Sequence, residues 1–297
     1  MPFTHSRVFR VRYYECDAYG HLNNANYLRY MQETAFDASA AAGFGIQRYA
    51  EMQRLWLIRG TQIEYLRPVR YNDSIEVKTW VMEFRRVSSR RAYEFYLEGT
   101  QELVARAYTD WVFIDTNTGR ATTILPEVSA AYFPKGVHQS SPQRENYPIA
   151  PPPPSGVFKM RRRVSWRDID QMHHVNNAVY LEYIEECGMQ VIAAHHWPWT
   201  RMAAEGFAII LRQHHIQYLQ PALIEDELEI ATWVSEVKRS SAMRHYTIRR
   251  AGDGELLAQV HTLGVWIDLS TGRPIRIPPN FIADFASNIS AGERLEV

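Results

Sequence analysis

Alternation of apolar and polar residues predicts a strand over residues 8–14, followed by an irregular turn that pivots on Gly20. A helix should come next, because apolar or small residues recur at spacings of three and four until Gly43 and Gly45 end the pattern. Four strands of an antiparallel meander then follow at 55–69, 74–84, 91–97 and 103–114, with turns at 88–89 and 99–100. The helical stripe consists of Tyr27, Leu28, Met31, Ala35, Ala38 and Ala42.

The same pattern returns in the second half of the chain. Residues 158–166 predict a strand, 178–194 a helix, and 228–234, 245–248 and 256–267 further strands. Residues 17–33 and 170–186 are identical at nine of 17 positions, and the offset from Asp17 to Asp170 is kept over roughly a hundred residues. The sequence therefore predicts one domain written twice, an arrangement that most often mimics a two-fold homodimer.

The predicted fold class is α+β, with each long helix covering one face of an antiparallel sheet. We expect a first domain at 1–133 and a second at 157–297. The linker between them, 134–156, is rich in proline, and Pro151 to Pro154 should form a stiff spacer. The residues after Pro278 carry no clear pattern.

Composition narrows the class of protein. The chain of 297 residues is 46% apolar, which suffices for two hydrophobic cores, and its 33 basic residues balance 33 acidic ones. No net field favours nucleic acid or an anionic membrane. No stretch is apolar enough for a signal peptide or a membrane span, so the expected location is the cytoplasm. Cys16 and Cys187 occupy non-equivalent repeat positions, which argues against a disulfide framework.

Pairs of adjacent histidines invite a metal hypothesis, at 173–174, 195–196 and 214–215. Adjacent histidines rarely converge on one ion, and no cysteine or carboxylate lies at ligand spacing. We therefore expect neither a metal nor a cofactor. Basic residues at 85–86, 90–91 and 238–239, with Arg244, flank corresponding turns in the two copies. Of these, Arg86 and Arg239 are candidates for gripping a phosphate of the substrate, or else are solvated turn charges.

The repeated motif, Asp-x-x-x-His-x-Asn-Asn-Ala-x-Tyr opening a helix, resembles that of the hotdog-fold thioesterases. The first copy, from Glu15 to Ala25, is similar to the acyl-CoA and 4-hydroxybenzoyl-CoA thioesterase type. The second, from Trp166 to Asn177, is more similar to the acyl carrier protein (ACP) thioesterases, which also carry two hotdog domains in one chain. The resemblance implies a tandem hotdog fold, in which each long helix is wrapped by a curved antiparallel sheet.

The resemblance also implies a catalytic set. Asp17 and Asp170 would act as nucleophile or general base, and His21 and His174 would orient the carboxylate or the substrate carbonyl. The backbone amides of Asn24 and Asn177 would stabilise the oxyanion at the start of each helix. Read from the residues alone, each Asp is a turn or capping residue and each His binds backbone carbonyls. Asn23 and Asn176 are either helix caps or substrate-binding residues.

Two departures separate this chain from the plant ACP enzymes. Their Asn two residues before the motif His is replaced by Tyr19 in the first copy and Met172 in the second. The Glu on their following strand is replaced by Pro68 and Pro221. The Asp of the acyl-CoA type is present in both copies.

These observations predict hydrolysis of an acyl thioester carried on coenzyme A (CoA) or ACP. A hotdog hydratase is disfavoured because its Asn-Pro segment is absent. The alternative to an enzyme is a non-catalytic protein that binds or senses acyl thioesters. The expected partners are the thioester substrate and, for the assembly, a second copy forming a homodimer of double hotdogs. Acyl chain length, the carrier and the number of active copies stay open.

Overall fold

The computed structural model describes residues 2–134, 136 and 146–290 of the 297-residue chain. The chain divides into two compact units, residues 1–146 and 147–297. This division falls inside the predicted linker, of which residues 135 and 137–145 lie outside the described part. Nothing in the described helices is both long and apolar enough to cross a membrane.

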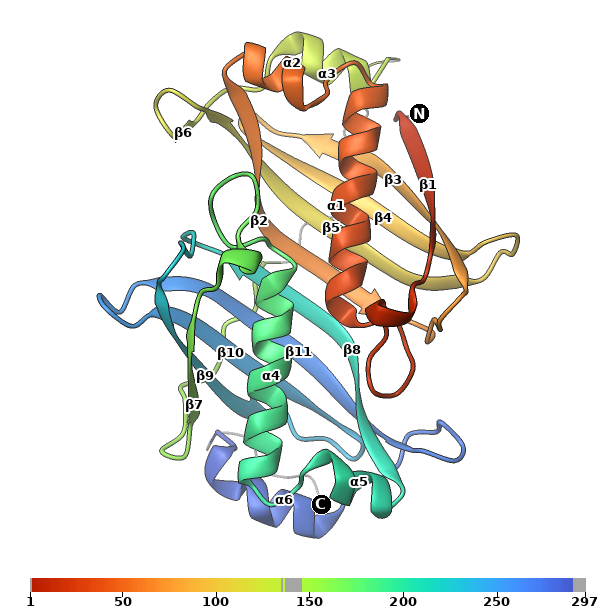
Figure 1. Cartoon of the computed structure of the whole chain (residues 1–297), viewed down its shortest axis with the longest axis vertical. Coiled ribbons are helices and arrows are strands. Elements are labelled where there is room, and N and C mark those ends of the chain that lie inside the picture. Colours follow the sequence, from red (N-terminus) through yellow and green to blue (C-terminus); the bar gives the residue numbers. More distant parts are fainter. Residues whose placement is uncertain (1, 135, 137–145, 291–297) are drawn as a thin grey trace. The chain divides into compact units, whose positions relative to one another are not determined.

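The first unit is a five-stranded antiparallel sheet with one long helix across a face (Figure 1). The strands pair in the order β1-β3-β4-β5-β2, and the short β6 pairs with β5. In chain order the elements are β1 (Thr4–Arg10), the 3₁₀ turn η1 (Tyr13–Glu15), α1 (Asn24–Ala41), α2 (Ile46–Glu51), β2 (Arg54–Tyr65), β3 (Ser74–Phe84), β4 (Ser88–Leu97), β5 (Leu103–Asp115), β6 (Arg120–Ala121) and α3 (Pro126–Tyr132).

The second unit repeats this topology, with strand order β7-β9-β10-β11-β8 and the long helix α4 across one face (Figure 1). The predicted α+β class, with a helix on an antiparallel sheet in each half, is confirmed. The elements are β7 (Phe158–Arg163), η2 (Trp166–Asp168), α4 (Val179–Ala194), α5 (Trp199–Ala204), β8 (Phe207–Tyr218), β9 (Glu227–Ser235), β10 (Ser241–Arg250), β11 (Leu256–Asp268), α6 (Pro279–Phe285) and η3 (Ala286–Asn288).

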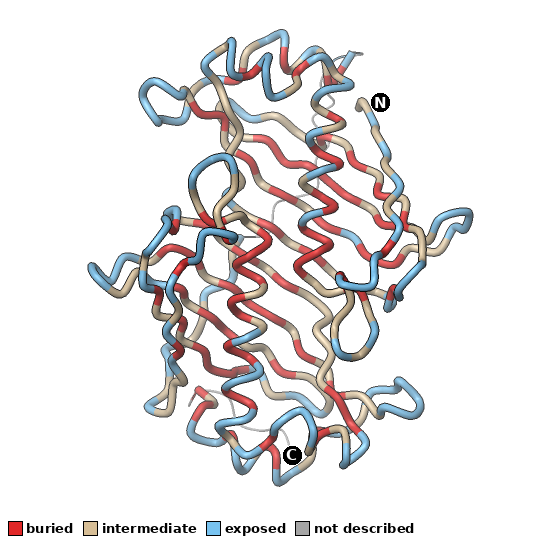
Figure 2. Tube along the Cα trace, in the orientation of Figure 1, coloured by how far each residue is buried: buried red, intermediate tan, exposed pale blue. Residues whose placement is uncertain are grey.

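The core of each unit lies between its helix and its sheet. In α1 the predicted stripe from Tyr27 to Ala38 is buried, as are alternate residues of β3 such as Ile75 and Val77 (Figure 2). Burial of these apolar groups, at about 25 cal/mol per Å², is the main force that holds helix to sheet. The spacing of four in the helix and two in the strand brings the two apolar faces together.

Several predicted strand boundaries are wrong: the strand predicted at 55–69 ends at Tyr65, the one at 158–166 ends at Arg163, and the one at 245–248 extends over Ser241–Arg250. The first strand ends at Arg10 instead of Tyr14, because Tyr13–Glu15 fold into η1, where the Glu15 carboxylate accepts a hydrogen bond from the backbone N–H of Arg12 at 2.8 Å. The turn predicted at residues 88–89 lies one step earlier, since Ser88 already begins β4 and its carbonyl accepts a hydrogen bond from the N–H of Arg85.

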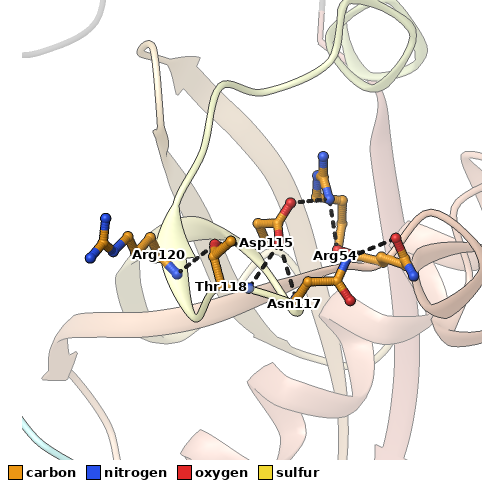
Figure 3. Close-up of polar contacts among 6 residues, drawn as sticks. Arg54, Asp115, Asn117, Thr118 and Arg120 are labelled. Atoms are coloured by element: carbon orange, nitrogen blue, oxygen red, sulfur yellow. Dashed lines mark hydrogen bonds and ion pairs between the residues drawn. The ribbon is translucent and has the colours of Figure 1, made fainter.

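The turn after β5 shows how a single carboxylate orders a loop (Figure 3). Oδ1 of Asp115 accepts hydrogen bonds from the backbone N–H groups of Asn117 and Thr118 at 3.0 and 3.1 Å. Its other oxygen binds the guanidinium of Arg54 at 2.6 Å. Gly119 closes the turn with a φ of 65°, a left-handed conformation that suits glycine. The same use of an aspartate recurs at the candidate site.

Candidate active site

The first motif forms a tight loop between η1 and α1. Backbone bonds close it, from Asp17 N–H to His21 C=O at 2.7 Å and from Gly20 N–H to Asp17 C=O at 3.0 Å. Oδ1 of Asp17 accepts hydrogen bonds from the N–H groups of Tyr19 and His21 at 2.9 and 3.0 Å. Its Oδ2 forms no hydrogen bond within residues 2–134, 136 and 146–290. Asp17 thus orders the loop with one oxygen and leaves the other available.

The loop leads directly into the N-terminus of α1. Asn23 caps the helix, because its Oδ1 accepts a hydrogen bond from the N–H of Ala25 at 2.9 Å. The backbone N–H of Asn24, the first helical residue, has no hydrogen-bond partner in the part of the chain that the structure describes. An unpaired amide at a helix N-terminus carries partial positive charge and can bind an anion. The capping role predicted for Asn23 is confirmed.

The second motif has the same backbone frame, with Asp170 N–H bonded to His174 C=O at 3.0 Å. Its carboxylate is held differently. Oδ1 accepts a hydrogen bond from the N–H of Met172 at 2.8 Å and lies 3.9 Å from Nδ1 of His174. Oδ2 accepts a hydrogen bond from Nδ2 of Asn176 at 3.2 Å. Both carboxylate oxygens of Asp170 are therefore oriented by neighbours within its own motif.

Asn176 connects the second loop to its helix. The same side chain that donates to Asp170 accepts a hydrogen bond from the N–H of Ala178 at 3.0 Å, and so caps the first turn before α4. The backbone N–H of Asn177 has no hydrogen-bond partner among the described residues, and its carbonyl accepts a bond from the Tyr218 hydroxyl at 3.0 Å. In the first unit the equivalent Tyr65 hydroxyl donates to the Asn24 carbonyl at 3.4 Å.

The two motif histidines differ in surroundings. Burial lowers the pKa of His21 below its ordinary value, an effect that Asp17 opposes and Arg70 reinforces. Nδ1 of His174 lies 3.9 Å from the Asp170 carboxylate, beyond hydrogen-bond distance, and 3.3 Å from the Val175 carbonyl. His174 thus lies within hydrogen-bond distance of a backbone carbonyl, and its role in orienting the carboxylate stays a prediction.

The motif analysis did not single out the buried acid that precedes each Asp by two residues. The Glu15 carboxylate accepts a hydrogen bond from the Tyr30 hydroxyl of α1 at 2.7 Å, and its carbonyl accepts one from the Asn23 N–H. Asp168 repeats this with Tyr183 of α4 at 2.8 Å and with the N–H of Asn176. These acids fix each helix against the loop. Glu15 and Asp168 occupy equivalent positions in the two copies, and this repetition of an acid could have identified them from the sequence.

The predicted basic residues do not gather at the Asp loops of their own units. Arg86 lies beyond the end of β3, whereas the Asp17 loop adjoins the strand's start, where the Leu22 N–H bonds the Val69 carbonyl. The 11-residue strand separates them by about 33 Å. Arg239 occupies the equivalent turn after β9, where its carbonyl accepts a hydrogen bond from the N–H of Ile277.

Three other arginines that were predicted to flank turns, Arg90, Arg91 and Arg244, lie within strands. Arg90 and Arg91 are both 6% exposed within β4, where Nη1 of Arg91 donates to Oγ1 of Thr79 at 3.3 Å. Arg244 of β10 makes the equivalent bond to Thr232 at 3.4 Å. The interpretation of these three arginines as turn residues is therefore wrong, because the strands extend further toward the turns than predicted. Within the described ranges no cluster of His, Cys, Asp or Glu is arranged to hold a metal ion.

Comparison with known proteins accounts for nearly all of this architecture. Residues 2–132 match the family model of the acyl-ACP thioesterase N-terminal domain, and residues 164–285 match that of the thioesterase-like superfamily. The chain belongs to the hotdog-fold thioesterase superfamily. Its architecture is the tandem hotdog that the motif implied.

Solved structures of the superfamily share the fold over most of the chain. A 12:0-ACP thioesterase from Umbellularia californica superposes with a TM-score of 0.70 at 18% identity, covering 88% of this chain and 94% of that one. An acyl-ACP thioesterase from Bacteroides thetaiotaomicron gives 0.69 at 18% identity, covering 88% and 97%. At this level of identity the likeness establishes the fold alone.

Curated relatives are similar over parts of the chain. An acyl-ACP hydrolase of Cuphea viscosissima is 28% identical over 188 residues, which are 60% of this chain and 45% of the relative. An acyl-CoA thioester hydrolase of Escherichia coli is 27% identical over 129 residues, 43% of this chain and 96% of the relative. This hotdog protein thus spans about half the length of the plant relatives it matches.

Proposed function

We propose that this protein hydrolyses acyl thioesters carried on CoA or ACP. The observation that carries the proposal is the arrangement around Asn176, whose side chain binds the Asp170 carboxylate and also accepts a hydrogen bond from the N–H of Ala178 in the turn before α4. The neighbouring N–H of Asn177 has no hydrogen-bond partner among the described residues. A carboxylate and an anion-binding helix end are thereby held together. The Asp17 loop provides the same elements in the first unit.

Asp170 serves as general base or nucleophile in this mechanism, and Asp17 does so in its own unit. As a base, the carboxylate takes a proton from water while the water oxygen bonds to the thioester carbon. The carbonyl oxygen gains negative charge, which the amide of Asn177 or Asn24 stabilises; one such donor is typically worth about 3 kcal/mol. The C–S bond then breaks, and the proton passes to the departing thiolate.

The names of the relatives support the reaction class and leave the carrier open. The Cuphea viscosissima relative is named a hydrolase of acyl-ACP, and the Escherichia coli relative a hydrolase of acyl-CoA. Both names describe cleavage of the same thioester bond. Because each similarity covers only part of this chain, we propose cleavage of the thioester bond and leave the carrier open.

The test is release of free thiol from a panel of acyl-CoA and acyl-ACP substrates of different chain length. We expect turnover by the wild type and a loss to background in the double variant Asp17→Asn/Asp170→Asn. Asp115→Asn is the matched control, since that carboxylate orders a turn far from either motif in sequence.

A wild type that binds acyl thioesters without releasing thiol from any of them would contradict the proposal. It would favour the alternative of an acyl-thioester binder or sensor. Retention of turnover in the double variant would keep the reaction and exclude the aspartates as its base.

A further inference from the structure

A groove of about 570 Å³ lies on the first unit, beside the start of the Asp17 loop. It runs along β1 and η1 and is bounded on its other sides by α1 and the segment between β2 and β3. Its volume is in the range of about 300–1,000 Å³ that suits a small organic ligand. The aromatic and basic residues that line it and matter for ligand binding are Phe9, Arg10, Arg12, Tyr13, Tyr30 and Tyr71.

Aromatic rings form the floor and the mouth of the groove. At the floor, Phe9 of β1 stacks on Tyr30 of α1 with ring centroids 4.2 Å apart and planes 6° from parallel. At the mouth, Tyr13 and Tyr71 meet edge to face at 5.7 Å, and they are 79% and 56% exposed. Exposed aromatic rings held in place by one another offer a flat surface on which another ring can stack.

The guanidinium groups of the groove differ in how they are neutralised. Arg12 lies 3.4 Å from the carboxylate of Glu15, and Arg7 binds carboxylates of α1. Arg10 instead donates through Nε and Nη2 to Oδ1 of Asn72, a neutral acceptor. In the described part of the chain Arg10 has no acidic partner. Its fixed, uncompensated charge suits a phosphate.

The second unit has the same strand and helix arrangement but different residues at the positions equivalent to those of the groove. Arg163 stands at the position of Arg10, but its partner is Glu225, 3.9 Å away, where the first unit has Asn72. At the position of Phe9 stands Arg162, whose guanidinium lies 4.5 Å from the Tyr183 ring centre. In the second unit the cation is thus paired and the apolar floor is lost.

We propose that this groove binds the adenosine nucleotide end of CoA, so that the first unit selects acyl-CoA over other acyl thioesters. The purine ring stacks at Tyr13 and Tyr71, and Arg10 binds a phosphate. This inference rests on the proposed thioester hydrolysis and specifies its carrier. Recognition of a nucleotide by an aromatic surface beside a guanidinium follows from the π-face of the base and the charge of the phosphate.

The position of the groove is consistent with one bound molecule reaching the catalytic carboxylate. Tyr13 precedes Asp17 by four residues, so their Cα atoms are at most about 15 Å apart. The pantetheine arm of CoA spans a comparable length between its phosphates and its sulfur. The nucleotide can therefore occupy the groove while the thioester reaches the Asp17 loop.

Calorimetric titration with adenosine 3′,5′-bisphosphate tests the site without requiring turnover. We expect binding by the wild type and at least about tenfold weaker binding for Tyr13→Ala and Arg10→Ala. Asn72→Glu should act similarly, because it gives Arg10 the acidic partner that Arg163 has. The backbone tolerates this change, because Glu225 already adopts a φ of 70° at the equivalent position, close to the 76° of Asn72. Trp166→Ala, an exposed aromatic at the equivalent position of the second unit, is the matched control and should bind as the wild type does.

Kinetics then connect the groove to the carrier. In an Asp170→Asn background, where the first unit supplies the remaining turnover, the same variants should raise KM for an acyl-CoA about tenfold and leave KM for the corresponding acyl-pantetheine unchanged. If the wild type does not bind the nucleotide, and the variants have the same KM for acyl-CoA as their parent protein, the proposed nucleotide site is refuted. The proposed hydrolysis would be unaffected by that result. A rise in KM confined to acyl-ACP would also refute the nucleotide site, in favour of a carrier-protein contact. Nucleotide binding by a wild type that hydrolyses nothing would instead refute the proposed function alone.

Discussion

The loops at Asp17 and Asp170 share one backbone and differ in how they hold the carboxylate. In the first loop the left-handed position is filled by Gly20, with a φ of 75°; in the second it is filled by His173, with a φ of 61°. Among the residues that the structure describes, Asp17 is fixed through one oxygen, whereas Asp170 is fixed through both. The backbone hydrogen bonds therefore define the loop, and the side chains decide how rigid its carboxylate is.

This comparison leads us to expect unequal sites. A carboxylate that is already oriented loses less freedom when it meets a substrate. Asp170 also has the imidazole of His174 at 3.9 Å, whereas the hydrogen bond from His21 to Asp17 comes from the backbone N–H of His21. The second loop is thus better arranged for catalysis, and the first unit carries the groove proposed to bind the nucleotide.

The largest effect should come from removing the Asp170 carboxylate. We expect Asp170→Asn to lower thiol release by about 10²–10⁴-fold, the usual contribution of a general base. Asp17→Asn should lower it about twofold or less, since its loop is the less organised of the two. Initial rates with a single acyl-CoA measure both, and the opposite order would reverse the assignment of the principal site.

Acid should destabilise the second unit far more than the first. Burial lowers the pKa of His214 and His245 to about 3 and that of His261 to about 4. The unfolded chain binds these protons near pH 6.5, so stability is full above that value and falls as the pH drops toward the folded pKa values. The loss is about 1.4 kcal/mol per pH unit for each histidine.

Hydrogen exchange followed by mass spectrometry at pH 7.5 and 5.5 measures this difference. Protection of β10 and β11 should fall, and that of β4 and β5 should hold, because the first unit has Thr61, Ala92 and Tyr108 at the equivalent positions. His261→Tyr, which copies the first unit, should restore part of the protection. Equal losses in both units would mean that these histidines do not control acid stability.

A smaller effect is expected at the buried acids. Tyr183→Phe removes a 2.8 Å hydrogen bond from Asp168, which is 2% exposed, and should lower the free energy of unfolding by about 1–3 kcal/mol. Tyr30→Phe should act alike on Glu15. Urea unfolding reports both values, with Tyr13→Phe as the control, because that hydroxyl belongs to an exposed ring. An unchanged free energy of unfolding in both variants would show that backbone hydrogen-bond donors alone satisfy these buried carboxylates.

The smallest effect concerns the left-handed position. His173→Gly should stabilise the protein by up to about 1 kcal/mol, because a side chain at positive φ is strained. Gly20→Ala should destabilise it by a similar amount, although no neighbouring atom lies closer than 4.0 Å to the added methyl group. Thermal unfolding distinguishes the two. A stabilised Gly20→Ala variant would imply that the first loop relaxes.

Much of the fold followed from the sequence because the helical stripe and the alternating strands express their periodicity directly. The buried run from Tyr27 to Ala38 and the limits of β3 were predicted correctly. The end of β1 was not, since the alternation continues through Tyr13 and Tyr14 while the Glu15 side chain bends the backbone. Such a local hydrogen bond leaves no trace in a hydrophobic pattern.

The site was predictable as a set of residues and less so as an arrangement. The repeat pointed to Asp17 and Asp170, whose loops indeed adjoin helix N-termini; their catalytic role stays a prediction. The groove could not be foreseen, because its walls come from β1, α1 and the segment after β2, and its charge depends on whether residue 72 or 225 is an amide or a carboxylate.

The proline-rich segment is bonded to the second unit over part of its length. The carbonyl of Pro151 accepts a hydrogen bond from the Trp233 indole at 3.1 Å, and that of Pro152 accepts one from Ser290 at 2.8 Å. Upstream, the Tyr147 ring packs against His215 and His261, each at 4.7 Å. Anyone expressing the second half by itself should begin the recombinant chain at or before Tyr147, because starting at the first strand would strip a covering layer from the sheet and expose its histidines to water.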